Sequence, residues 1–148
     1  MKPLQYFLTE SVSQLASVKV LRAYTNNDAK HPEADYHANK ITLYGKFFGH
    51  PDGVQRHILF HEVGHWYRSA FVPLSDIMGW EDGEKFNNLF SAGNSEEGFA
   101  EAFAVLCTTP SDLNRYPVAR DLLKSWVSAS DVAYVKAWVD RTMAHLPS

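Results

Sequence analysis

Two histidines four residues apart, with a glutamate directly after the first, are the residues of this chain best suited to chemistry. The run His61-Glu62-Val63-Gly64-His65 has the pattern H-E-x-x-H. On a helix, side chains four positions apart lie on one face, so His61 and His65 are predicted to offer two imidazoles to one metal ion. Glu62 is then placed to reach a water molecule on that metal, as a zinc hydrolase requires.

The same pattern also fits two buried histidines and a surface glutamate with no metal between them, and a third ligand decides between the two interpretations. A catalytic zinc ion takes three protein ligands and keeps one position open for water. One class of zinc peptidases supplies a third histidine six residues after the second, with a glycine halfway between. Phe71 and Arg68 occupy those two positions here, which excludes that class.

In another class the third ligand is a glutamate from a separate helix. The segment 95–104 reads S-E-E-G-F-A-E-A-F-A and contains Glu96, Glu97 and Glu101. Because Glu97 and Glu101 are four residues apart, they lie on one face of a helix. Carboxylates at the start of a helix are also common without a metal, since they favour the positive end of the helix dipole.

The combination of H-E-x-G-H with a later E-G-F-A-E-A-F-A resembles the gluzincin zinc metallopeptidases. Within that family it is similar to small, minimal members and to the catalytic domain of anthrax lethal factor, over about residues 36–107. The resemblance implies a zincin-like fold, Zn²⁺ as the cofactor and a peptide or protein substrate. It also implies that Glu97 is the zinc ligand and that Glu101 supports a zinc-bound histidine, fixing its tautomer. Glu101 as the ligand is the main alternative, and Glu96 is a third candidate.

The chemistry expected of such a site is hydrolysis of a peptide bond. Zinc lowers the pKa of a bound water toward neutrality and polarises the carbonyl to be attacked. Glu62 would take the proton from the attacking water and pass it to the leaving amine.

A group that stabilises the oxyanion, commonly a tyrosine or a histidine, is also expected. Lethal factor has a tyrosine about two helical turns ahead of its glutamate ligand, and Phe90 stands at that position here. The candidates for the cleft are therefore His57, Tyr67 and Tyr44, with Tyr36 and His37 also available. By the same resemblance, strand 41–44 is expected to be an edge strand that binds an extended peptide, with Thr42 and Tyr44 facing the cleft. An ordinary sheet strand is the alternative.

Two helices must bring these residues together. Apolar residues at helical spacing predict a helix over 54–69 that carries H-E-x-x-H, with Asp52 as N-cap and Gln55 as its capping-box partner. A second helix is predicted over 95–108, ended by Pro110. The other predicted elements are a helix over 3–16, strands over 18–24, 34–37 and 41–44, a short helix over 82–90, and helices over 117–128 and 131–145, the last with Ser130 as N-cap.

This order of elements, a helix, three strands and then helices, predicts an α+β fold with segregated elements. Together with the resemblance, it predicts one zincin-like domain over residues 1–148. We expect a small, mainly antiparallel sheet, an active-site helix, a glutamate helix and C-terminal helices.

Composition limits the partners. The chain has 148 residues, of which 45% are hydrophobic and 21% charged, with a net charge of −3. Nothing in this balance favours nucleic acid, and no apolar run is long enough to span a membrane. The single cysteine, Cys107, excludes an internal disulfide and is expected to be buried. The N-terminal segment is a poor signal peptide, so we expect a cytoplasmic protein, with leaderless export as an alternative.

Two other functions remain open from the sequence. One is a zinc-binding regulatory or interaction module of the same fold that no longer cuts a substrate, which the phenylalanine at position 90 favours. Against it, Glu62 binds no metal and would have no role in a purely structural site, where four protein ligands are usual. The other is a metal-free helical interaction protein, which requires both motifs to be accidental.

Overall fold

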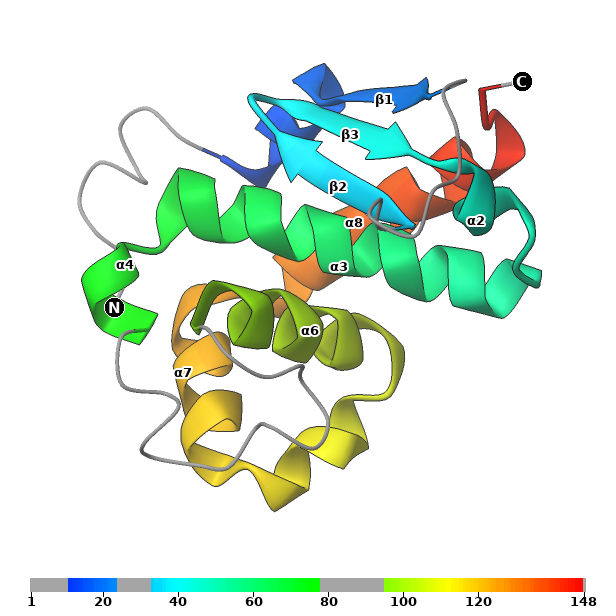
Figure 1. Ribbon diagram of the computed structural model, residues 1–148. Coiled ribbons are helices and arrows are strands. Elements are labelled where there is room, and N and C mark those ends of the chain that lie inside the picture. The colour runs from blue at the N-terminus through cyan, green and yellow to red at the C-terminus, as the bar shows by residue number, and fades with distance from the viewer. Residues whose placement is uncertain (1–10, 24–32, 78–94, 148) are drawn as a thin grey trace.

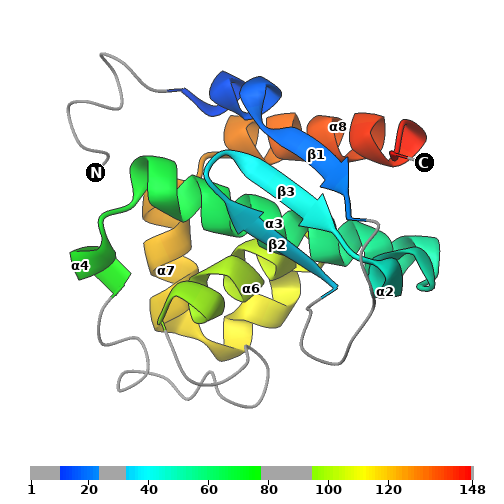
Figure 2. The same ribbon diagram turned by 45° about the horizontal axis from the view of Figure 1, so that its top comes forward.

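The structure is a computed structural model that describes residues 11–23, 33–77 and 95–147. Its elements are η1 (Val12–Ser17), β1 (Lys19–Arg22), β2 (Ala34–His37), β3 (Lys40–Leu43), α2 (Gly45–Phe48), α3 (Asp52–Phe71), α4 (Leu74–Ile77), α6 (Ser95–Thr108), η3 (Pro110–Arg115), α7 (Pro117–Trp126) and α8 (Ala129–Ala144). The fold is α+β and mostly helical, as the sequence predicted. The helix α3 runs through the middle, with the sheet on one side and α6 and α7 on the other (Figures 1 and 2).

The sheet has three strands in the order β1-β3-β2. Strands β2 and β3 form an antiparallel hairpin, whereas β1 pairs parallel to β3. The prediction of a mainly antiparallel sheet is therefore wrong, because β1 lies on the far side of β3 and runs in the same direction. The hairpin turns at Ala38 and Asn39, whose φ angles of 49° and 66° suit a tight turn between twisted strands.

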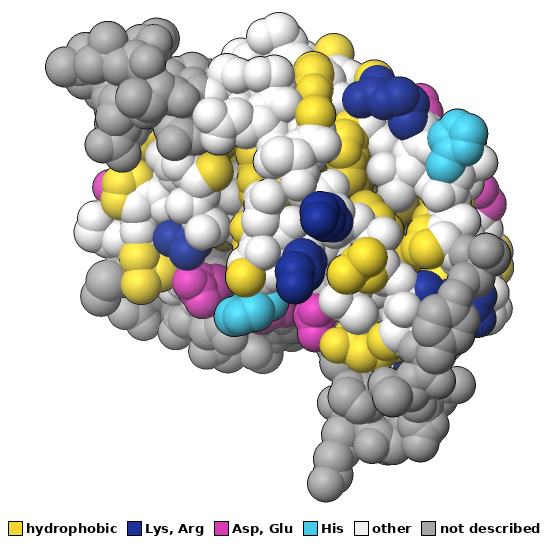
Figure 3. Space-filling model, turned by 90° about the horizontal axis from the view of Figure 1, so that it is seen from above, with side chains coloured by type: hydrophobic (Ala, Val, Ile, Leu, Met, Phe, Trp, Pro, Cys, Tyr) yellow, Lys and Arg dark blue, Asp and Glu magenta, His cyan; other side chains and the backbone are white. Residues whose placement is uncertain are grey.

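Alternating burial shows which side of the sheet covers the core. Ile41 and Leu43 of β3 are fully buried, while Lys40 is exposed. On the outer face, Lys40 lies opposite Lys19 of β1, and Leu21 is also exposed. Viewed from above, this face presents Lys and Arg side chains among hydrophobic ones (Figure 3). The inner face of the sheet thus packs against the core, with β2 lying against α3.

The long helix α3 is buried on more than one side, because the sheet and α6 cover different faces of it. Its predicted N-cap is wrong: Pro51 caps the helix, and Asp52 lies in the first turn, where Arg56 bonds its carboxylate at 2.8 Å. Gln55 forms no capping box, since its side-chain amide donates to the carbonyl of Phe47 at 3.1 Å. The helix also extends beyond the predicted 54–69 at both ends.

A glycine lets α3 and α6 touch backbone to backbone. A Cβ placed on Gly64 would lie 2.8 Å from Cα of Ala100, 2.9 Å from its carbonyl oxygen and 3.1 Å from Cβ of Phe103. No larger residue fits at position 64 without moving α6 away. The boundaries of α6 confirm the predicted helix over 95–108.

This contact gives a prediction for Gly64→Ala. We expect the variant to lose about 3 kcal/mol of unfolding free energy, because the added methyl meets backbone atoms that cannot turn aside. Gly53→Ala is the matched control on the same helix: nothing lies within 4 Å of its Cβ, so it should be neutral or slightly stabilising. Denaturant unfolding of both variants checks this, and equal stability would contradict the close-contact account.

The C-terminal helices complete the core. Ser128, and not the predicted Ser130, caps α8, because its hydroxyl accepts from the backbone N–H of Asp131 at 3.1 Å. Cys107 is buried, as predicted. Of the predicted helix over 3–16, residues 12–16 lie in the 3₁₀ helix η1, and residues 3–10 lie outside the described residues, as does the predicted helix over 82–90. Within the described ranges, no helix combines the length and apolar character needed to cross a membrane.

Candidate metal centre

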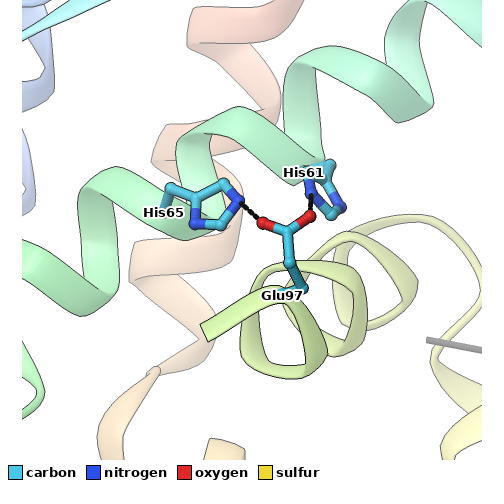
Figure 4. Close-up of side chains that lie close together, drawn as sticks. All are labelled: His61, His65 and Glu97. Carbon is cyan, nitrogen blue, oxygen red and sulfur yellow. Dashed lines mark ion pairs between the residues drawn. The ribbon is translucent and has the colours of Figure 1, made fainter. Parts of the chain in front are cut away.

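Three side chains from two helices converge at one point. His61 and His65 project from α3, and Glu97 projects from the first turn of α6 to meet both of them (Figure 4). Nε2 of His65 lies 2.6 Å from Oε2 of Glu97, and Nε2 of His61 lies 3.3 Å from Oε1. One ligand atom from each of the three residues lies within 4.8 Å of the others.

These donor atoms form a group that could hold a divalent metal ion. Nitrogen and oxygen ligands lie at about 2 Å from zinc, so atoms that share one ion lie within about 4 Å of each other. The two carboxylate–imidazole distances satisfy this limit. Two imidazoles and one carboxylate form a donor set known from catalytic zinc sites, and they also suit other divalent transition ions. Of the three glutamates named from the sequence, Glu97 is the one that contacts both histidines.

The other two candidate glutamates lie elsewhere. Oε1 of Glu101 lies 2.9 Å from Nδ1 of His61, on the opposite side of the ring from Glu97. Its other oxygen, Oε2, lies 2.8 Å from Nε2 of His57. Glu96 pairs with Arg68 at 3.3 Å. Glu101 is thus placed to orient the ring of His61 so that Nε2 faces the convergence point.

The buried carboxyl of Glu62 lies beside these ligands. The residue is only 6% exposed, and its carboxylate accepts a hydrogen bond from the backbone N–H of Tyr36 on β2. Burial raises the pKa of Glu62 to about 8; the nearby carboxylates of Glu97 and Asp35 add to this, while the charge of His61 opposes it. Glu62 lines a cavity of about 270 Å³ together with His57, His61 and Glu97.

Hydrogen bonds and charges among these side chains shift one another's pKa values strongly. Burial by itself would lower the pKa of His61, but hydrogen bonds to Glu101 and Glu97 outweigh it and raise the pKa to about 10. Hydrogen bonds with His61 and His65 lower the pKa of Glu97 well below its usual range. Burial opposes ionisation of Glu101, yet its bonds to His57 and His61 bring its pKa down to about 2. A metal ion bound through Nε2 of His61 would have to displace the proton there, so its binding would release protons.

Glu62 gives a prediction about stability. A carboxyl whose pKa rises from 4.5 to about 8 on folding favours the folded state least when it is ionised. Its destabilising effect is therefore absent below pH 4.5 and grows as the pH rises toward 8. We expect metal-free Glu62→Gln to be about 4 kcal/mol more stable than the unaltered protein at pH 8 and equally stable near pH 4. Denaturant unfolding at the two pH values measures this, and a gain that is the same at both would contradict it.

Of the three residues named for the cleft, His57 lines the cavity beside Glu62. Tyr67 does not: it is fully buried, and its hydroxyl donates to the carbonyl of Trp126 at 2.7 Å and to Asp131 at 2.9 Å. That prediction is wrong because Tyr67 follows His65 by two residues, which turns it to the opposite side of α3.

Tyr44 does not line the cavities around Glu62, and its hydroxyl bonds Asp35. The hydroxyl donates to Asp35 at 2.8 Å, which raises the pKa of Tyr44. The prediction that strand 41–44 lies at the edge of the sheet is wrong, because β3 is the central strand. Thr42 lies on the face of the sheet opposite the buried Ile41.

The edge strand beside the metal centre is β2. Ala34, Asp35 and Tyr36 line a cavity of about 400 Å³ with Glu62 and the candidate ligands His65 and Glu97. Sequence reasoning missed the bond from the Tyr36 backbone to Glu62. No motif encodes it, since it depends on where β2 crosses α3.

No protein-family model, no curated protein and no solved structure matches the chain. The convergence of His61, His65 and Glu97 is what indicates a metal centre.

Proposed function

We propose that the protein is a zinc-dependent peptidase of the gluzincin type. One observation carries this proposal: His61, His65 and Glu97 converge from α3 and α6, and the buried Glu62 lines the same cavity. A structural metal site has no need of a buried carboxylate next to its ligands, and burial of that group is unfavourable for stability. A hydrolase needs it as a general base.

Each residue then has a distinct task. His61, His65 and Glu97 would hold the zinc ion, which when bound acidifies water and polarises the substrate carbonyl. Glu62 would accept a proton from the attacking water and deliver it to the leaving amine. Its pKa of about 8 would fall as a cation binds nearby, toward the neutral range in which a general base works best.

The substrate would be an extended peptide placed along β2. One side of β2 pairs with β3, and no described strand pairs with its other side. Its residues line two adjoining cavities, one with Glu62 and Glu97 and the other with His65 and Arg68. A peptide that adds to this strand would pass Glu62 and the metal ligands, so we assign β2 the role expected for strand 41–44.

A peptide library tests the proposal. Zinc-loaded protein should cleave members of the library, removal of zinc by a chelator should stop cleavage, and added zinc should restore it. Mass spectrometry of the products identifies the cleaved bonds. Protein that binds zinc at this site but cleaves no peptide would contradict peptidase activity and favour the non-cutting zinc module.

A further inference from the structure

Five side chains alternate between α3 and α6 in one continuous series of contacts. His65 meets Glu97, Glu97 meets His61, His61 meets Glu101, and Glu101 meets His57, at 2.6, 3.3, 2.9 and 2.8 Å. The three histidines follow one another at four-residue spacing on α3, and the two glutamates do the same on α6. The series extends one residue beyond those that the metal and its supporting glutamate require, and that residue is His57.

The hydrogen positions in this series follow from the chemistry of Glu101. An ionised carboxylate accepts hydrogen bonds and has no hydrogen to donate. The ring nitrogens that face it, Nδ1 of His61 and Nε2 of His57, must therefore both carry a hydrogen. With Nδ1 occupied in this way, the proton that His61 gives up when a metal binds comes from Nε2, the nitrogen on the side of Glu97, and the lone pair is left there. Glu101 thereby selects the tautomer of His61 that can bind a metal.

A glutamate that makes one hydrogen bond can still rotate about its side-chain bonds, and each lost rotamer costs entropy. His57 anchors the second oxygen of Glu101, so that the first stays on His61. The ring nitrogen of His57 points at Glu101, and His57 does not belong to the group whose atoms converge on a metal position. It is therefore placed to act through Glu101 and not as a ligand.

We propose that His57 is a positioning residue of the metal centre, which fixes Glu101 so that Glu101 holds His61 with Nε2 toward the metal. This inference rests on the zinc site of the proposed function and adds to it a residue that no ligand motif contains. The side chain of His57 is 37% exposed. An ion pair this exposed contributes little to stability by itself, so the effect of His57 should appear in metal affinity.

Three variants test the proposal through the zinc dissociation constant, measured by competition with a chromophoric chelator. His57→Leu removes the donor and should weaken zinc binding roughly 10-fold, the lower end of the effect of residues that orient ligands. His57→Gln keeps an N–H donor at a similar reach and should recover most of the affinity. His50→Leu is the matched control: it breaks another His–Glu pair, with Glu33 at 2.7 Å, and neither residue of that pair belongs to the group whose atoms converge on a metal position. It should leave zinc affinity unchanged.

A second readout follows the hydrogen on Nδ1 of His61 directly. In the zinc-loaded protein, the imidazole N–H signal of His61 in NMR spectra should exchange slowly with water. In His57→Leu it should exchange faster, because Glu101 is less firmly held.

The outcomes separate this inference from the function on which it rests. If the unaltered protein binds zinc through His61, His65 and Glu97, and His57→Leu binds it equally well, the inference is overturned and the zinc site stands. If His57→Leu binds zinc weakly and His57→Gln does not restore the affinity, the inference is also overturned, since loss of the N–H donor would not explain the weak binding. If the unaltered protein binds no zinc at this site, both fall together.

Discussion

Glu62→Gln is expected to lower the turnover number for peptide hydrolysis by about 10³-fold while the protein keeps its zinc. Glutamine has nearly the same shape and can still accept the hydrogen bond from the backbone of Tyr36. It has no basic oxygen, however, and cannot take a proton from water. A well-placed general base contributes about 10²- to 10⁴-fold to rate. Hydrolysis of a cleaved library peptide, together with the zinc content of the same sample, measures both effects.

Asp52→Asn is a suitable control for this variant, because it also neutralises a carboxylate on α3. Asp52 lies in the first turn of the helix and bonds Arg56, away from the metal ligands. Its turnover should match that of the unaltered protein. If Glu62→Gln kept more than a tenth of the turnover, Glu62 would not be the general base.

The second large effect concerns the third ligand. Glu97→Gln should weaken zinc binding about 100-fold or more, because loss of a residue that only orients a ligand already costs about 10- to 100-fold and Glu97 is the proposed ligand itself. An amide is a much poorer zinc ligand than a carboxylate. Calorimetric titration of metal-free protein with zinc measures the loss.

Glu96→Gln is the matched control for Glu97→Gln. It neutralises the neighbouring carboxylate on the same turn of α6, which pairs with Arg68 and does not belong to the converging group. Its zinc affinity should be unchanged. Equal zinc affinities for Glu96→Gln and Glu97→Gln would show that Glu97 is not a ligand. A larger loss of affinity in Glu101→Gln than in Glu97→Gln would make Glu101 the ligand and Glu97 the supporting residue.

Helical spacing predicted the parts of the site that lie on single helices. It placed His61 and His65 on one face of α3, with His57 one turn earlier, and it placed Glu97 and Glu101 on one face of α6. The same spacing also explains why Tyr67 does not line the cavity, since a residue two positions from His65 points away from the face that carries the histidines.

Helical spacing and strand propensity could not predict the contacts between separate elements. Which of Glu96, Glu97 and Glu101 meets both histidines depends on how α6 lies against α3, and that is set by the contact of Gly64 with Ala100. The sheet was misjudged for a similar reason. Strand propensity indicates where β1 and β3 lie along the chain, but their parallel pairing joins residues about 20 positions apart. That pairing makes β3 central and leaves β2 beside the metal centre.

The central claim is that α3 and α6 together hold one divalent ion. A crystal structure of the zinc-loaded protein, with anomalous scattering recorded at the zinc absorption edge, tests it most directly. We expect one anomalous peak at about 2.0–2.2 Å from Nε2 of His61, Nε2 of His65 and an oxygen of Glu97. A zinc ion bound elsewhere, or a Glu97 side chain turned away from both imidazoles, would contradict the account.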